Sequence, residues 1–252
     1  MKRIAMIDGD IVAYQQAGLT EVPVHWGDDI WTLHADAKEA KQKVDAFLED
    51  MKVEVEADSY LVAVSGQDNF RKAIYPLYKE HRTGRRPMVL GEVKEHLIFK
   101  HKAKWAPVLE ADDIMGVWAT TPERGVEKVL ISIDKDFRTI PGLHYNWNEP
   151  IEKIVEVSEA EADYNFLTQT LTGDTTDGYP GCPGVGPKKA EAILGDVKAF
   201  TSIKDAWPAV VKAFVKAGLN EKEAIVQAQM ARILRHEEYN FHTHKIYLWR
   251  PE

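Results

Sequence analysis

The chain has 252 residues, of which 44% are hydrophobic, so it can bury a sizeable core in one large domain or two closely packed ones. Its single cysteine, Cys182, excludes an internal disulfide framework and favours a reducing compartment, which predicts an intracellular protein. Apolar runs never reach the roughly 18 residues of a membrane span, and the net charge of −8 leaves attraction for nucleic acid to local basic segments.

Three short apolar segments each end at or shortly before an aspartate. They are residues 3–7 before Asp8, residues 60–64 before Asp68, and residues 129–133 before Asp134. Their length and composition predict parallel β-strands, and apolar residues at helical spacing predict a helix over 35–51. Strands that alternate with helices predict an α/β fold with a parallel sheet. In such sheets, ligands bind beyond the carboxyl ends of the strands, where these aspartates fall.

A basic segment follows the second predicted strand. From Lys79 to Lys104, eight Lys or Arg residues stand against three Glu, a local charge of +5. Just before it, Tyr75 and Tyr78 interleave with Arg71, Lys72 and Lys79, an arrangement that can stack unpaired bases while the cations follow the backbone. The active-site candidates are Tyr78, Lys79 and Arg82, of which the last two are expected on one face of a helix. Expected DNA contacts are Arg71, Arg85 and Arg86, and the alternative is a solvated basic helix.

Carboxylates outside these strands complete a constellation of acids. Its members are Asp8, Asp10, Asp68, Glu110, Asp112, Asp113, Asp134, Asp136, Asp174 and Asp177. Oxygen ligands without histidine favour a hard ion such as Mg²⁺ or Mn²⁺. A single aspartate at a strand end or helix start is usually a turn or cap residue, so the prediction depends on several acids meeting at one sheet edge. Their crowding predicts a pair of metal ions.

After about residue 157 the strand pattern stops, and helices are expected to the end of the chain. Capping-box spacing marks two helix starts, Ser158 with Glu161 and Asn220 with Glu223. A glycine-rich turn opens a third helix, with the residues Gly184, Val185, Gly186, Lys188 and Lys189. Glycines let backbone N–H groups approach a phosphate, and the lysines attract it without reading bases. The alternative is an ordinary glycine-rich helix start.

In combination, five motifs resemble the 5′-nuclease superfamily of flap endonucleases and 5′→3′ exonucleases, particularly its short phage-encoded members. They are IDGD, FR followed by YPLYKEHR, LEADDIMG, ISIDKDF and LTGDTTDGYPGCPGVGPKKA. The resemblance implies a PIN-like nuclease domain over residues 1–157 with a helical arch at about 79–106, then a helical region over 158–252 with a helix-three-turn-helix element. It also implies metal-dependent hydrolysis of phosphodiesters at or near DNA 5′ ends, which leaves 5′-phosphates.

The resemblance also assigns roles to single residues. The acids Asp8, Glu110, Asp112, Asp113, Asp134 and Asp136 would hold the first ion or be shared, and Asp174 and Asp177 would hold the second. Lys79 and Arg82 match cations at the base of the arch, and the Gly184–Lys189 turn matches a hairpin that in relatives also holds K⁺. Two acids depart from the family pattern: Asp68 fits a ligand role only with a shifted loop, and Asp10 fits a cap or a neighbour of the ligands.

The expected partner is DNA with 5′ ends, flaps or nicks, with RNA in RNA–DNA hybrids as a further substrate, for a monomer in the host cytoplasm. Two other functions would use only part of these motifs. A haloacid-dehalogenase-type phosphatase shares the IDGD and GDTTD patterns, but leaves EADD, DKD and the hairpin without a role. A non-catalytic DNA-binding protein would use the hairpin alone, and its carboxylates would repel the bound phosphates.

Overall fold

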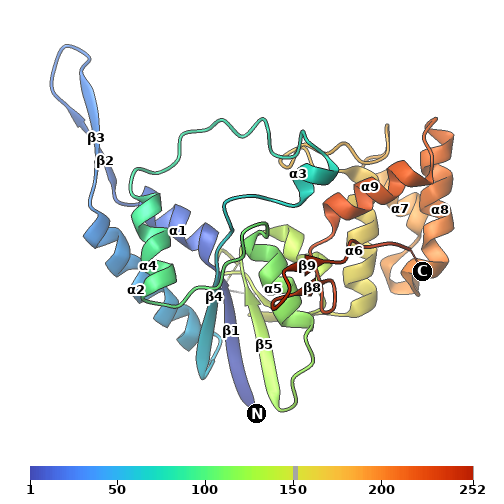
Figure 1. Cartoon of the computed structure of the whole chain (residues 1–252), viewed down its shortest axis with the longest axis horizontal. Helices are drawn as coiled ribbons and strands as arrows, with labels where there is room; N and C mark the ends of the chain where they lie inside the picture. Colours follow the sequence, from blue (N-terminus) through green and yellow to red (C-terminus); the bar gives the residue numbers. More distant parts are fainter. Residues whose placement is uncertain (150–152, 252) are drawn as a thin grey trace.

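The computed structural model describes residues 1–149 and 153–251. Its centre is a five-stranded sheet in the order β4-β1-β5-β6-β7, and Figure 1 shows β4, β1 and β5 side by side. The strands are β1 (Lys2–Asp8), β4 (Ser59–Ala63), β5 (Val126–Ile131), β6 (Gly142–Tyr145) and β7 (Ile154–Val157). The first four pair in parallel and β7 is antiparallel at the edge. The three predicted strands are therefore confirmed, with β5 ending two residues earlier than expected.

Helices cover both faces of this sheet because β1 is apolar on both sides. Ala5 and Ile7 face a core that includes α1 (Gly9–Gly18), α2 (Ala37–Glu54) and α4 (Leu90–Phe99). Met6 faces the opposite core with α5 (Ala111–Thr120). Successive side chains of a strand point to opposite faces, so this alternation places the carboxyl ends of β1 and β5 between two helical layers.

A protruding hairpin was not predicted. After α1 the chain forms β2 (Glu21–His25) and β3 (Trp31–Ala35), which pair antiparallel and extend away from the sheet (Figure 1). Trp26 and Trp31 are exposed in it. The helix expected over 35–51 is confirmed as α2, which begins at the side-chain cap of Asp36.

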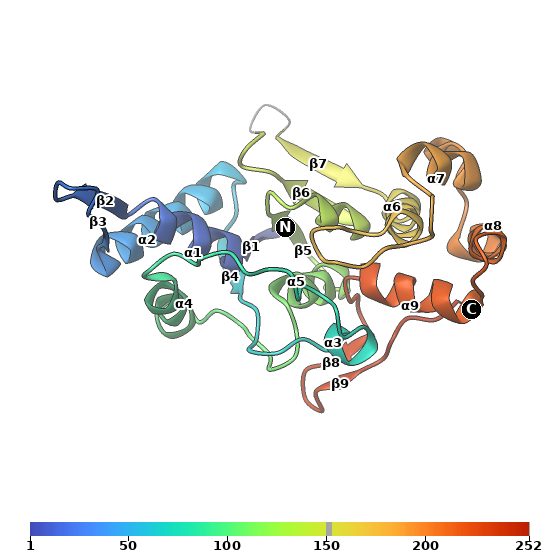
Figure 2. The same ribbon diagram turned by 90° about the horizontal axis from the view of Figure 1, so that it is seen from above.

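The second half of the chain is largely helical, as expected. Its helices are α6 (Glu159–Thr172), α7 (Pro187–Leu194), α8 (Ile203–Lys216) and α9 (Glu221–Ala231), with the 3₁₀ turn η3 (Val197–Ala199) between α7 and α8. The Asn220–Glu223 capping box is complete, whereas Ser158 accepts from the Glu161 N–H without the reciprocal bond. These helices lie at the end of the molecule opposite the β2–β3 hairpin (Figure 2). They are held by their own core around Phe166 and Trp207.

The chain then returns to the sheet, which sequence patterns did not indicate. Ile233, Leu234 and Tyr239 pack in the core behind α5, and the short strands β8 (Tyr239–Asn240) and β9 (Lys245–Ile246) follow. The two halves therefore share a core, and the boundary after residue 157 stays a proposal. No helix among residues 1–149 and 153–251 is long and apolar enough to cross a bilayer.

The segment expected to form the arch is helical only in its second part. After α3 (Arg71–Ile74) the chain runs through turns and an extended loop to α4, which packs on α1 and α2 (Figure 1). Lys79 lies in a turn with φ +56°, so the expectation that a helix presents Lys79 and Arg82 on one face is wrong. Pro76, Gly84 and Pro87 interrupt the helical pattern here, and proline in particular removes a helical N–H.

Candidate active site

One group of carboxylates lies where α5 begins. Oxygens of Glu110, Asp112 and Asp113 come within 4.8 Å of one another, in a geometry that could hold a metal ion. Asp177 joins this group through Tyr78, whose hydroxyl lies 2.8 Å from both Glu110 Oε2 and Asp177 Oδ2. Glu110 and Asp177, which are far apart in sequence, are thus connected through the hydroxyl of one buried tyrosine.

Two cations border this group. Lys79 Nζ contacts Glu110 Oε1 and lies 3.5 Å from Asp177 Oδ2. Arg82 donates to Asp177 Oδ1 at 2.6 Å and to the Thr176 carbonyl at 3.1 Å. Both expected active-site cations are therefore at the carboxylates, although a turn rather than a helix brings them there.

The second group lies at the carboxyl ends of β1 and β5. Asp8 is buried and accepts from the Asp10 and Ile11 N–H groups and from Ser132 Oγ. Asp134 starts η1 (Lys135–Thr139) by accepting from the Asp136 N–H at 2.9 Å. Ser132 links the two residues, since its Oγ donates to Asp8 and accepts from the Asp134 N–H, and this is possible because β1 and β5 are adjacent parallel strands that end at the same edge of the sheet.

The GDTTD turn after α6 joins the two groups. Asp174 Oδ1 accepts from the N–H groups of Thr176 and Asp177, at 2.6 and 3.2 Å, and so shapes the turn. Asp177 shares the Tyr78 hydroxyl with Glu110, while Asp174 interacts electrostatically with Asp136. The motif therefore places one aspartate beside each group.

The pKa values of three acids show that negative charge is crowded here. Burial, and then Asp10, raises the pKa of Asp8 to about 7. Burial together with Asp134 and Asp174 raises the pKa of Asp136 to about 6, and burial with Glu110 and Asp113 raises that of Asp112 well above its usual range. Divalent cations would relieve this repulsion, and the all-oxygen donor set suits hard ions, so the residues fit a metal centre.

Glu110 behaves differently from these acids. Burial raises its pKa, but the charges of Arg71 and Lys79 outweigh burial and bring the pKa down to about 2. Glu110 is thus ionised at neutral and mildly acidic pH. It can accept a cation without first losing a proton.

The raised pKa values predict how metal binding depends on pH. Without metal, the folded protein holds protons at Asp8 and Asp136 that the unfolded chain releases near pH 4, so stability should fall as pH rises from about 4 to 7. Added Mg²⁺ should raise the melting temperature more at pH 8 than at pH 5.5, because at pH 5.5 it must displace these protons. Thermal melts with EDTA or Mg²⁺ at both pH values measure this, and an equal shift at both would contradict the assignment.

Asp113 has a different place from the one expected. It is fully buried, and Arg71 donates to both of its carboxylate oxygens, at 2.7 and 2.8 Å. The N–H groups of Leu234 and Glu110 also donate to it. With its oxygens engaged in this way, Asp113 anchors the start of α5 to the chain after α9. One of its oxygens also lies within 4.8 Å of those of Glu110 and Asp112, so its expected role as a metal ligand stays a prediction.

Arg71 was expected to contact DNA, and this is wrong. The side chain is 2% exposed and also donates to the carbonyls of Met230 and Arg232. A guanidinium that is enclosed by protein on all sides cannot reach a phosphate. Arg71 instead joins α3, α5 and the end of α9 behind the first carboxylate group.

Tyr78 is likewise buried, with 2% exposure, so it cannot stack on a base. Its role in the site is to position Glu110 and Asp177. Asp68 is exposed, and its carboxylate accepts from the N–H of Asn69 at 2.8 Å, so its expected role as a metal ligand stays a prediction. Asp10 pairs with Lys94 of α4 at 2.7 Å and accepts from the Ser65 N–H, so it ties α1 to its neighbours.

A cavity of about 1290 Å³ opens beside the first group. Its lining includes residues of the loop before α4 and of α4 itself, together with Glu110, Tyr78, Asp68 and Asp10. Basic side chains on its wall include Lys72, Lys79, Arg82, Arg85, Arg86 and Lys94. Arg85 is paired with Glu21 of β2, and this pairing lowers the pKa of Glu21 to about 2. Arg86 is exposed.

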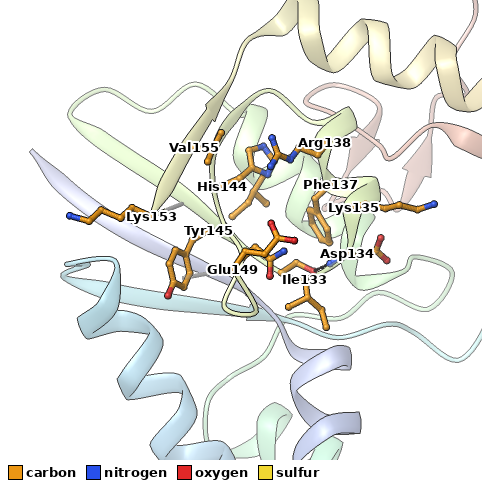
Figure 3. A pocket seen from close by; sticks show the side chains of 13 residues that line it. Ile133, Asp134, Lys135, Phe137, Arg138, His144, Tyr145, Glu149, Lys153 and Val155 are labelled. Atoms are coloured by element: carbon orange, nitrogen blue, oxygen red, sulfur yellow. Dashed lines mark hydrogen bonds between the residues drawn. The ribbon is translucent and has the colours of Figure 1, made fainter. Parts of the chain in front are cut away.

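A smaller pocket of about 200 Å³ lies between η1 and strands β5, β6 and β7 (Figure 3). Asp134 and Lys135 are at its rim, and His144 lines it from β6. Burial lowers the pKa of His144 to about 4, and its Nε2 is bonded to the Ile140 carbonyl. His144 is therefore neutral at pH 7, and its Nε2 is already hydrogen-bonded. It offers neither a general base nor a positive charge for a phosphate.

The glycine-rich turn follows the GDTTD turn closely in the chain and precedes α7. Gly184 has φ +73°, which favours glycine, and Gly186 caps the helix before Pro187. Lys189 Nζ donates to the Gly184 carbonyl at 2.6 Å and so braces the turn. Lys188 is exposed beside it, and Val185 is partly buried against the helical core. Gly184 and Gly186 are exposed together with Lys188.

Some contributors to the site were not predicted. Ser132 holds Asp8, Gln169 bonds Asp136, and Lys94 neutralises Asp10. Only Ser132 had a signal in sequence, since it stands within the ISIDKD motif two residues before Asp134. The other two come from helices whose faces are set by tertiary packing.

Fold and site together define a nuclease of the 5′-nuclease class: a parallel α/β sheet with acids at its carboxyl edge, followed by a helical region. The fold is similar to that of a solved structure of the bacteriophage T5 D15 protein co-crystallised with metal ions, with a TM-score of 0.66, 15% identity and coverage of 91% of this chain and 89% of that one. A T5 D15 flap endonuclease complex with DNA and metal ions matches with a TM-score of 0.62 and 14% identity, over 91% of this chain and 89% of that one.

Sequence comparison identifies the family. The chain is 33% identical to the exodeoxyribonuclease of Enterobacteria phage T3 over 99% of its own length and 93% of that protein, and 33% identical to the exonuclease of Escherichia phage T7 over 99% and 94%. A flap endonuclease Xni from Shewanella piezotolerans is 31% identical over 56% of this chain and 59% of that protein. No family model matches. The chain belongs to the phage exonuclease family of 5′-nucleases.

Proposed function

We propose that this protein is a divalent-metal-dependent 5′→3′ exonuclease and flap endonuclease that hydrolyses phosphodiesters at or near DNA 5′ ends and leaves 5′-phosphates. The observation that carries the proposal is the pair of carboxylate groups joined by the GDTTD turn beside a large cavity with a basic wall. The phage T3 and T7 relatives are named as exonucleases, which agrees with it. Phage relatives also favour action in the host cytoplasm.

Two ions, Mg²⁺ or Mn²⁺, fit the two groups. Glu110, Asp112 and Asp177 would hold one, and Asp8, Asp134, Asp136 and Asp174 would hold the other. Bound divalent ions supply a nucleophilic water at neutral pH and stabilise charge on the attacking and leaving oxygens.

The residues of the chain itself orient the reacting phosphate. Tyr78 holds Glu110 and Asp177 in register, and Lys79 and Arg82 present positive charge at the edge of the same carboxylates. In this arrangement both cations pair with the carboxylates, and metal ions bound there would leave their charges for a phosphate that reaches this edge. A phosphate inside a duplex cannot easily reach metal ions at the base of a cavity, so we expect the end nucleotides to unpair first, at a cost of a few kcal/mol by analogy with base extrusion.

Lys79→Ala should therefore reduce the single-turnover cleavage rate by roughly 10²- to 10³-fold, because it removes a preorganised donor at the phosphate. Affinity for the same flap DNA at fixed salt should fall far less. Lys72→Ala is the matched control, since Lys72 is exposed on the wall of the same cavity. If Lys79→Ala loses only affinity and keeps its saturated rate, Lys79 is a steering charge without a catalytic role.

The Gly184–Lys189 turn is proposed to bind duplex phosphates away from the chemistry, with K⁺ as an accessory ion. Because Lys189 also braces the turn, Lys188→Ala isolates a single phosphate contact. It should lower the slope of log K against log salt by about one, equally for all sequences, without affecting the rate at saturation. Lys216→Ala on α8 is the control. A slope that is identical in wild type and Lys188→Ala would remove this residue from the interface.

The proposal is tested by cleavage of labelled DNA in Mg²⁺, with flap, nicked and blunt substrates and with closed circular DNA as a control that has no ends. We expect short products from the substrates with ends, and slower or no cleavage of the closed circle. An RNA–DNA hybrid in the same assay tests the wider substrate range, and gel filtration tests the expected monomer. Hydrolysis of a phosphate monoester with intact DNA would instead favour the phosphatase alternative.

A further inference from the structure

Three further side chains that could hold a metal ion lie between α2 and α4. Asp45 comes from α2, His96 from α4, and His101 from the turn that follows α4. One ligand atom from each comes within 4.8 Å of the others. The two helices pack against each other, so the three side chains are held together by the fold rather than by sequence proximity.

The contact atoms converge on one point. His96 Nε2 lies 2.7 Å from Asp45 Oδ1, and His101 Nε2 lies 2.6 Å from the same oxygen. The two imidazole rings are 5.3 Å apart at 72°, so they approach the carboxylate from different directions. Ligands of a zinc-class ion lie about 2.0–2.2 Å from the metal, so these atoms need to separate by less than about 1 Å to admit one.

We propose that Asp45, His96 and His101 form a binding site for one transition-metal ion of the zinc class. Two imidazole nitrogens and one carboxylate oxygen suit such an ion, whereas Mg²⁺ prefers the oxygen-only groups of the active site. Three protein ligands leave the remaining position to water. The bound ion would connect α2 to the end of α4, and so restrain one side of the cavity beside the active site.

Neighbouring side chains support this assignment. Tyr60 hydroxyl lies 3.0 Å from His101 Nδ1, the ring nitrogen that faces away from Asp45. Histidines that bind metal commonly have such a partner, and a hydroxyl can accept from Nδ1–H when Nε2 binds the ion. Lys100 pairs with the other carboxylate oxygen, Asp45 Oδ2, at 2.6 Å and leaves Oδ1 for the metal. His101 is 7% exposed and His96 16%, so water competes little.

The test is a Zn²⁺ titration of the full chain by calorimetry, in buffer with excess Mg²⁺ to occupy the carboxylate groups. We expect one site in wild type whose affinity falls by about 10²-fold or more in His96→Gln and in His101→Gln. Tyr60→Phe should weaken it by about 10-fold, as expected for a partner of a ligand. His242→Gln removes an exposed histidine elsewhere and should leave the site unchanged.

Visible absorption of the Co²⁺-substituted protein gives a second readout, because nitrogen-containing sites of low coordination absorb more strongly than octahedral oxygen sites. The band should be present in wild type and His242→Gln and absent in His96→Gln, which serves where His101→Gln disturbs folding. Mg²⁺-dependent cleavage checks that each variant is folded. If zinc affinity and the cobalt spectrum are the same in His96→Gln as in wild type, the cluster is a hydrogen-bonded group only and the proposal fails.

Discussion

Asp112→Asn should lower Mg²⁺-dependent cleavage by on the order of 10³-fold, the upper end of the cost of removing one preorganised electrostatic group. Asp112 lies between Glu110 and Asp113, and burial with these neighbours holds its pKa well above the usual range. Its negative charge therefore costs stability until a cation binds. We therefore expect the charge of Asp112 to bind a cation.

This physical reason also predicts a second effect of the same substitution. Without metal, Asp112→Asn removes a repelling charge, so the free energy of unfolding measured in EDTA should stay equal or rise. The stabilisation by added Mg²⁺ should fall. The assays are single-turnover cleavage and denaturant unfolding with and without Mg²⁺, and Asp50→Asn on the exposed side of α2 is the control. Near-normal cleavage by Asp112→Asn would remove this residue from the metal centre.

Asp113→Asn, unlike Asp112→Asn, should destabilise the folded protein in EDTA, with a loss of about 3–5 kcal/mol in the free energy of unfolding. Arg71 is 2% exposed and Asp113 is fully buried, so removing one charge leaves the other buried without its partner. Denaturant unfolding in EDTA measures this directly. Cleavage should also fall, because the pair holds the start of α5, which carries Glu110 and Asp112.

A double substitution separates structure from catalysis at this pair. Arg71→Met with Asp113→Leu removes both charges and should recover the part of the lost stability that an unpaired buried charge costs, but not the hydrogen bonds to the Met230 and Arg232 carbonyls and the Leu234 N–H. If Asp113→Asn instead unfolds like wild type but loses cleavage and Mg²⁺ stabilisation, Asp113 is a ligand after all. The role that its contacts with Arg71 indicate would then be wrong.

The sheet and its acidic edge could be predicted from sequence because their signals are local. Each strand is a short apolar run, and the aspartates that follow Ile7 and Ile133 are adjacent to those runs. Parallel strands end at the same edge, so the meeting of Asp8 and Asp134 follows from topology alone. The capping residues Asp36 and Asn220 are local signals of the same kind.

The partners of the charged residues could not be predicted in this way. Arg71 and Lys79 both stand in basic sequence, yet one is buried against Asp113 and the other borders the active carboxylates. A charge run shows no sign of which member will turn inward, because that depends on contacts more than a hundred residues apart, such as Arg71 with Met230. The turn at Lys79 had local signals in the nearby prolines, and the helical prediction overlooked them.

The central claim is that the two carboxylate groups hold divalent metal and that hydrolysis begins at a DNA 5′ end. The most direct measurement uses one linear duplex with different labels on its 5′ and 3′ ends, incubated with the enzyme in Mg²⁺ or in EDTA. We expect early release of the 5′ label in short products, an intact 3′ end, 5′-phosphates on the fragments and no cleavage in EDTA. Release of the 3′ label first, or cleavage at the same rate in EDTA, would contradict this account.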